Sequence, residues 1–394
     1  MKNILIFLLT ILITNTSLYG EDIDITLNHA NKIVFVGDSL TELRTTSSFT
    51  REVAEELKYT IGGGNRELGY LPFTLYYVVK NGASKHGIYR TKLGSPMTKL
   101  YISSYARAKG MWGESDAKWY RPLYSHSPDG KGIYFLNGTG NDFIGMDIHK
   151  GSFDVARVYY LKQPNGGTFL AHFRDSKTED KVYINTNSSK YSLAYVDIKR
   201  KGNPSKIRMT KIKGKVAIYG VNTIYKRVDS KAFFKYDVFA RNGIMLRDFT
   251  HLNAEATTKY YSDIKPDIVF INIGTNDLKT IGIEEYRLRL MVYVNRIKQG
   301  SPKTQIVLIE PNRPKNYNKG RYKNYTLSRK YLSRILKWGY IDIPEDLGKG
   351  DRNKIMNFED MNRSNLMEDG VHPNKAGKKA IADCVLEYIY NNMK

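Results

Sequence analysis

Ser39 is the first residue whose type and position could do chemistry. It lies in the segment Gly37-Asp38-Ser39-Leu40, directly after the apolar run 33–36. A continuous apolar run that ends at a glycine is typical of a strand buried on both faces of a parallel sheet. Ligands of such sheets bind at the carboxyl ends of the strands, so Ser39 is placed to meet one. Because a serine hydroxyl is a weak nucleophile, it needs a neighbouring base that a third group orients.

His372 is the strongest of the seven histidines as that base. It lies in the segment 368–374, directly before the last predicted helix, and Asp369 precedes it by three residues. Asp and His at this spacing can place the carboxylate against one imidazole nitrogen while the other nitrogen faces the serine. His251 is the alternative base, and it could equally begin a helix or lie in the core.

Two further segments could stabilise a developing negative charge. Asn276 lies in the segment 274–277, which follows the buried-strand pattern of 267–273, and its amide could donate a hydrogen bond to an oxyanion. Gly243 follows the segment 236–240, which has the pattern of another buried strand, and without a side chain its backbone N–H could approach a substrate closely. Both segments also have the composition of ordinary turns, so neither identifies a site by itself.

The elements that position these residues come from two parts of the chain. Up to residue 59, and again after residue 234, buried-strand runs alternate with helical periodicity, as in the helix predicted over 283–299 and closed by Gly300. Between them, Gly-rich turns separate short runs rich in Tyr, Val, Ile and Thr, which is typical of an all-β sandwich. We therefore predict an α/β domain, residues 21–59 and 235–394, interrupted by a β-sandwich insertion at 60–234.

Residues 1–20 are typical of a secretory signal peptide. Lys2 precedes an apolar run over residues 4–13, and polar and small residues follow this run. The run is too short to span a bilayer, and no later stretch reaches the length of a membrane helix. We expect an exported protein without a membrane span after removal of the signal; an uncleaved N-terminal anchor is the alternative.

The chain of 394 residues is strongly basic, with 62 Lys and Arg against 39 Asp and Glu and a net charge of +23. This charge suits an anionic partner, and export argues against nucleic acid. In the densest basic stretch, 198–215, apolar Ile207 and Met209 alternate with polar residues, so a solvated strand face also explains it. The single cysteine, Cys384, excludes an intramolecular disulfide framework and a Cys-rich metal site. We expect no cofactor and no metal.

These segments, in this order, resemble the SGNH hydrolase (GDSL esterase) superfamily. Its blocks are Ser in a GDS motif, a Gly, Asn in G-x-N-D, and His in D-x-x-H near the end of the chain. The second block is the loosest here, because the residues around Gly243 depart from the usual small-residue pattern. The resemblance implies a three-layer α/β/α fold with a parallel five-stranded sheet. It also implies Ser39 as nucleophile, His372 as general base with Asp369 as its orienting partner, and an oxyanion hole from the Ser39 and Gly243 N–H groups and the Asn276 side chain.

A signal peptide, an SGNH core and a large β-rich insertion are together similar to bacterial peptidoglycan O-acetylesterases, whose insertion resembles a carbohydrate-binding module. The segment 153–169 looks like theirs. This resemblance implies a periplasmic serine esterase that removes O-acetyl groups from muramic acid residues of peptidoglycan. Aromatic residues of the insertion could stack on sugar rings, and the candidates are Tyr105, Trp112, Trp119 and Tyr120.

Two other functions fit the same residues. An O-acetyltransferase would use the same serine, histidine and aspartate with a sugar hydroxyl as acceptor in place of water. A glycan-binding wall protein with an inert hydrolase core is the second alternative, and the intact set of reactive residues argues against it. A lipase is disfavoured because no apolar lid-like helix is apparent. The sequence does not identify any protein partner.

Overall fold

The computed structural model describes residues 32–41, 49–50, 52–53, 56, 66–68, 70–72, 88–91, 98–102, 125–128, 133–135, 143–147, 155–173, 181–199, 206–224, 234–240, 243–315, 319–346 and 358–392. The expected signal peptide lies outside these residues. So do the four aromatic candidates of the insertion: Tyr105, Trp112, Trp119 and Tyr120.

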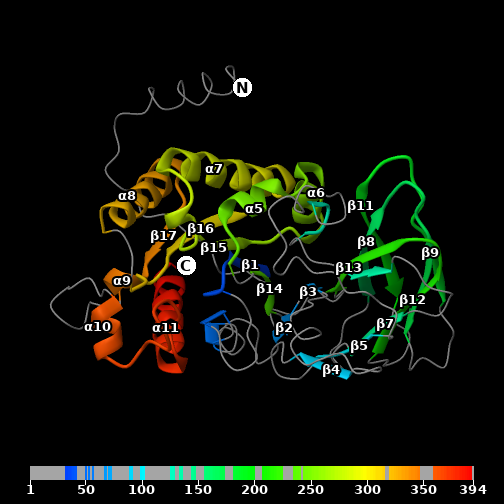
Figure 1. Ribbon diagram of the computed structural model, residues 1–394, viewed down its shortest axis with the longest axis horizontal. Coiled ribbons are helices and arrows are strands. Elements are labelled where there is room, and N and C mark those ends of the chain that lie inside the picture. The colour runs from blue at the N-terminus through cyan, green and yellow to red at the C-terminus, as the bar shows by residue number, and fades with distance from the viewer. Residues whose placement is uncertain are drawn as a thin grey trace, which may run out of the picture.

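Within the described residues, a parallel sheet of six strands forms the centre of the α/β part (Figure 1). The order is β17 (Gly339–Asp342), β16 (Gln305–Glu310), β15 (Ile268–Asn272), β1 (Lys32–Gly37), β14 (Phe234–Ala240) and β2 (Arg66–Leu68). Every side chain of β15 is buried, and so are those of β1 after Lys32. This burial on both faces explains the continuous apolar runs in the sequence.

Helices cover both faces of this sheet. Val34 and Val36 of β1 pack on one side, in a core that includes α5 to α8, and Ile33 and Phe35 pack on the other side with α11. The layers are therefore helix, sheet, helix, as the resemblance implied. The helices are α5 (Leu246–His251), α6 (Ala254–Ile264), α7 (Ile283–Gly300), α8 (Lys319–Leu336), α9 (Ile343–Asp346), α10 (Phe358–Arg363) and α11 (Lys375–Asn391), with a 3₁₀ turn at Asp277–Lys279.

The insertion contains two antiparallel sheets that pack face to face. One has the order β10–β9–β12–β7–β5–β4 and the other the order β11–β8–β13–β3, with β6 beside β13. The apolar residues between them come from β8, β9, β10, β11, β12 and β13, which makes a sandwich of the predicted kind. The bounds are β3 (Tyr70–Pro72), β4 (Ile88–Thr91), β5 (Thr98–Ile102), β6 (Ile133–Phe135), β7 (Phe143–Asp147), β8 (Val155–Lys162), β9 (Thr168–Phe173), β10 (Val182–Asn185), β11 (Ser192–Lys199), β12 (Lys206–Lys213) and β13 (Val216–Ile224).

The sandwich and the α/β part share one hydrophobic core. Tyr159 of β8 is fully buried, and its ring centroid lies 5.3 Å from that of Tyr260 on α6. Arg157 of β8 bonds to Asp197 of β11 at 2.7 Å, and its guanidinium carbon lies 3.7 Å from the centroid of the Tyr195 ring. The insertion is therefore packed onto the helices of the α/β part through large aromatic side chains (Figure 1).

Two details differ from the sequence expectations. The parallel sheet has six described strands instead of five, because β2 pairs with β14 although it lies in the range assigned to the insertion. Gly300 is the last residue of α7 and not its terminator, and Ser301 follows as the cap. A Cβ at Gly300 would lie 2.3 Å from the Thr258 carbonyl oxygen, so close packing against α6 explains this glycine. The limits of the insertion remain predictions.

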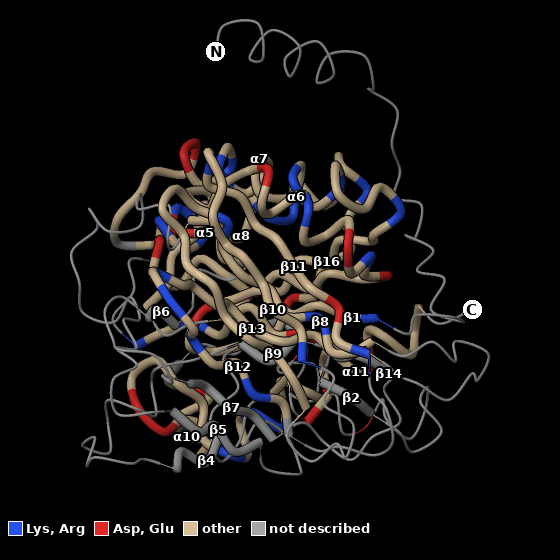
Figure 2. Tube along the Cα trace, turned by 90° about the vertical axis from the view of Figure 1, so that its right-hand side faces the viewer, with Lys and Arg blue, Asp and Glu red and all other residues tan. Residues whose placement is uncertain are grey.

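The basic stretch of the sequence lies partly on β12. Ile207 and Met209 point into the sandwich and are fully buried, as their alternation predicts. Lys211 continues this alternation and is buried although it is charged, whereas Ile212 on the other face is 39% exposed. A bulge between Lys211 and Lys213 then interrupts the pairing with β9. Figure 2 shows Lys and Arg both along the helices of the α/β part and on strands of the insertion. Among the helices that can be described, none is long and apolar enough to cross a membrane.

Candidate active site

Three neighbouring strands of the parallel sheet end in register, and each is followed by a residue expected in the site. Gly37, the last residue of β1, pairs with Ala240 of β14 and with Asn272 of β15. Ser39 follows β1, and the Gly243 and Asn276 segments follow β14 and β15. The sheet therefore brings three chain segments to one edge, although more than 200 residues separate the first of them from the others.

Ser39, His372 and Asp369 form a hydrogen-bonded chain at this edge. His372 Nε2 lies 2.9 Å from Ser39 Oγ, and His372 Nδ1 lies 2.8 Å from Asp369 Oδ2. An ionised carboxylate can only accept hydrogen bonds, so Nδ1 carries a proton, and in the neutral imidazole Nε2 is then the nitrogen that accepts from the serine hydroxyl. Nε2 is then the base that can take the proton of Ser39 when the oxygen attacks.

Asp369 is held in its charged form by the loop around it. Its Oδ1 accepts hydrogen bonds from the backbone N–H groups of Val371 and His372, both at 2.7 Å. Partial burial opposes ionisation, but the backbone N–H and imidazole of His372 and the N–H of Val371 outweigh it. They lower the pKa of Asp369 to about 2. One carboxylate oxygen thus fixes the loop while the other orients the imidazole.

Asn276 is hydrogen bonded to the segment that contains Gly243. The Asn276 side-chain N–H donates to the Ile244 carbonyl at 3.0 Å. An amide has two N–H donors, so this bond uses only one of them. Gly243 has φ +72°, a left-handed conformation that favours glycine, and a Cβ placed there would meet no atom within 4 Å. The structure therefore brings together the segments of the two expected oxyanion donors, which follow the strands on either side of β1.

Comparison with known proteins agrees with this arrangement. Residues 235–380 match the model of the GDSL-like Lipase/Acylhydrolase family. The match includes Gly243, Asn276, Asp369 and His372. The chain carries an SGNH hydrolase domain.

Several solved structures match the chain, and one of them, a peptidoglycan O-acetylesterase, has the same fold. It is 14% identical with a TM-score of 0.64, over 92% of this chain and 91% of that chain. A lipase/acylhydrolase from Enterococcus faecalis is 18% identical with a TM-score of 0.33, over 41% of this chain and 78% of that chain. A family two carbohydrate esterase from Clostridium thermocellum, solved with cellohexaose, is 13% identical with a TM-score of 0.26, over 67% of this chain and 95% of that chain. No curated protein matches the chain.

Asp38, which lies in the turn that presents Ser39, is a site residue without an expected role. Its Oδ1 accepts from the Leu40 N–H at 3.0 Å, which closes the turn that presents Ser39. Burial raises the pKa of Asp38 to about 7, and the Leu40 N–H opposes this shift in part. An Asp directly after a strand commonly bonds to the backbone two residues on, so this signal was present in the sequence.

Asn312 is a second residue that was not anticipated, and it supports the His372 loop of the SGNH domain. It follows β16, and its side-chain N–H donates to the Val371 carbonyl at 3.1 Å. The Lys315 N–H donates to the Gly370 carbonyl at 2.7 Å in the same loop. A fourth strand end therefore contributes to the site. His251, the alternative base, is the last residue of α5.

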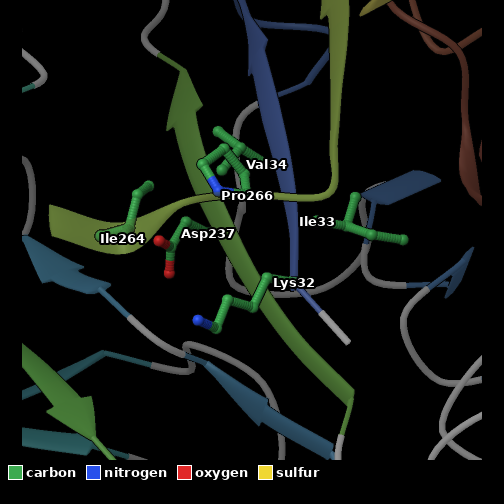
Figure 3. A pocket seen from close by; sticks show the side chains of 6 residues that line it. All are labelled: Lys32, Ile33, Val34, Asp237, Ile264 and Pro266. Carbon is green, nitrogen blue, oxygen red and sulfur yellow. The ribbon is translucent and has the colours of Figure 1, made fainter. Parts of the chain in front are cut away.

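A small cavity lies elsewhere in the SGNH domain, at the opposite end of β1 from Ser39 (Figure 3). It has about 10 Å³, room for a single water. This size and position argue against a role in substrate binding. Its lining residues are Lys32, Ile33, Val34, Asp237, Ile264 and Pro266. In the part of the chain that the structure describes, no three His, Cys, Asp or Glu residues are grouped to hold a metal ion.

Proposed function

We propose that this SGNH hydrolase is a periplasmic serine esterase that removes O-acetyl groups from muramic acid residues of peptidoglycan. The observation that carries the esterase chemistry is the hydrogen-bonded chain from Ser39 through His372 to Asp369. A serine activated in this way at a sheet edge, with oxyanion donors on the adjacent strand ends, suits acyl transfer.

The reaction has two halves. Ser39 Oγ attacks the acetyl carbonyl carbon while His372 Nε2 takes the hydroxyl proton, and Asp369 stabilises the resulting imidazolium. The N–H groups of Ser39 and Gly243 and the side chain of Asn276 hold the negative oxygen of the tetrahedral intermediate. The sugar oxygen leaves with the proton from His372, which leaves an acetyl ester on Ser39. Water, deprotonated by His372, then attacks this ester and releases acetate and the free serine.

Three features support the proposed substrate. A solved peptidoglycan O-acetylesterase has the same fold over almost the whole chain, insertion included. The net charge of +23 suits a wall polymer that bears free carboxylates. The expected signal peptide would export the chain to where that polymer is. A carbohydrate-binding role for the insertion, with Trp112 and Trp119 as stacking residues, is part of the same proposal.

The substrate is tested by acetate release from O-acetylated peptidoglycan, with Ser39→Ala as the matched control. We expect release by the wild-type protein and loss of release in the variant. Ser39-dependent cleavage of a small aryl acetate without release from peptidoglycan would retain the esterase and reject the wall substrate. Acetylated acceptor sugar in place of free acetate would identify a transferase. Sugar binding without turnover of either substrate would identify an inert binding protein.

A further inference from the structure

The backbone that leads to Asn276 is held by two buried side chains from helices α7 and α8, which lie side by side (Figure 1). The Tyr286 hydroxyl donates to the Ile273 carbonyl at 2.9 Å, and Arg329 Nη2 donates to the same carbonyl at 3.0 Å. Arg329 Nε also donates to the Tyr286 hydroxyl at 2.9 Å. The carbonyl, the hydroxyl and the guanidinium thus form a closed triangle three residues before Asn276.

Arg329 is itself fixed by a buried ion pair. Its Nη1 lies 2.7 Å from Glu310 Oε2, and the two side chains are 3% and 0% exposed. Glu310 ends β16 and also accepts from Thr326 Oγ1 at 2.9 Å and from the Tyr340 hydroxyl at 3.2 Å. With three donors on one carboxylate, the pair is satisfied and has little freedom to move. Arg329 therefore gives the loop a rigid support.

Gly274 leaves room for the Arg329 side chain. It has φ +130°, and a Cβ placed there would lie 2.1 Å from Arg329 Nη2 and 3.1 Å from the Tyr286 ring and hydroxyl. A side chain at this position would displace the guanidinium, so the glycine permits both the backbone conformation and the close approach of Arg329. The loop and the two side chains consequently fit as one unit.

On its other side the loop is bound to the segment that follows Gly243. Besides the Asn276 bond to the Ile244 carbonyl, both oxygens of Asp277 lie 3.1 Å from the Leu246 N–H. Asn276 therefore lies between two supports, one on the Gly243 segment and one on α7 and α8. The first support involves the expected oxyanion donors, whereas the second is made by side chains of α7 and α8.

We propose that Tyr286 and Arg329 are positioning residues that fix the Asn276 amide where the transition-state oxyanion develops. The inference rests on the proposed function, because it assigns Asn276 to the oxyanion hole. Such a donor acts only when it lies about 2.7–3.1 Å from the developing charge, and a displacement of about 1 Å can lower the rate about 100-fold. An interaction made only in the transition state affects kcat and leaves KM unchanged.

Tyr286→Phe tests this role, and Tyr293→Phe is its matched control. Both tyrosines are on α7 and 1% exposed, and each would lose one buried hydroxyl. The Tyr293 hydroxyl lies 2.9 Å from that of Tyr261, which is on the neighbouring helix α6. Initial rates are measured on a small aryl acetate, well below the thermal midpoint of each variant. We expect Tyr286→Phe to lower kcat about 10-fold or more with KM unchanged, and Tyr293→Phe to keep kcat within about twofold.

Some results of these kinetic measurements would overturn the inference. Equal kcat values for Tyr286→Phe and Tyr293→Phe would show that Tyr286 is only structural, as would a change in KM alone. Arg329→Lys is a second variant, which keeps the cation beside Glu310 but lacks the planar fork, and it should also lower kcat with KM unchanged. A wild-type protein without Ser39-dependent hydrolysis would overturn the proposed function and the inference together. An active wild type with equal tyrosine variants overturns the inference alone.

Discussion

His372 Nε2 lies 2.9 Å from Ser39 Oγ, although 333 positions of the sequence separate the two residues. Nearly the whole chain, with the β-sandwich insertion in it, folds between them. The contact depends on the parallel sheet, which fixes Ser39 at the end of β1, and on the loop before α11, in which Asp369 orients the imidazole. The reactive unit therefore exists only in the folded state.

Ser39→Ala and His372→Ala should each lower kcat about 10⁴-fold or more, because each removes a member of one proton-transfer unit. The kcat of the double variant should be no more than about tenfold below that of either single variant, because the effects of residues that act as one unit do not add. Steady-state kinetics with an aryl acetate measure all three. Independent, multiplying losses would show that the two residues do not act together.

Asn276→Ala should lower kcat about 10²- to 10³-fold with little change in KM, because it removes one donor to the oxyanion. The Asn276 side chain also bonds to the Ile244 carbonyl, so the thermal midpoint of the variant is compared with that of the wild type. Loss of activity in proportion to unfolded protein would contradict a role in the oxyanion hole.

Asp38 should make the protein less stable as the pH rises towards 7. Its pKa is about 7 in the folded protein, against about 3.9 for Asp in an unfolded chain. Between these two pH values the folded state keeps a proton that the unfolded state releases. The free energy of unfolding therefore falls from about pH 4 to pH 7, and above pH 7 it remains at this lower value. Asp38→Asn, which cannot ionise, should be on the order of 2–4 kcal/mol more stable than the wild type at pH 8.

Urea unfolding at pH 5 and pH 8 measures this difference. Asp383→Asn is the control, because Asp383 is an exposed partner of Lys379 on α11 and should change stability by about 0.5 kcal/mol or less. The advantage of Asp38→Asn should shrink from pH 8 to pH 5. An advantage that is the same at both pH values would show that ionisation of Asp38 is not its cause.

Asn312→Ala should lower kcat several-fold, about 3- to 30-fold, by releasing the Val371 carbonyl and with it the His372 loop. Asn253→Ala is the control: Asn253 caps α6 by accepting from the Ala256 N–H, and its loss should cost about 1 kcal/mol of stability without changing kcat. Equal kcat in the two variants would show that Asn312 does not position the histidine.

The reactive residues could be predicted from the sequence because each lies next to a strong local signal. Ser39 and Asn276 lie in short turns after predicted buried strands, and the carboxyl ends of parallel strands meet at one edge of a sheet. His372 lies beside Asp369, so the pair needed no long-range information to be noticed. The contact of His372 with Ser39 is not local, and only the order of the motifs indicated it.

The supports of the site could not be predicted in the same way. Glu310 and Arg329 are residue types that are usually exposed, and their burial follows from the packing of α8 against β16. β2 has only three residues, too short for a periodic signal, and it joins the parallel sheet through β14. Gly300 has the sequence signature of a helix end, but packing against α6 is what requires it.

The most direct test of the central claim is mass spectrometry of the protein after acid quenching during turnover of an aryl acetate. The account predicts one acetyl group, carried on the peptide that contains Ser39. His372→Ala should carry far less of it, because the attacking oxygen is then not deprotonated. An acetyl group on another residue, or turnover with no acetylated protein at any quench time, would contradict a mechanism through Ser39.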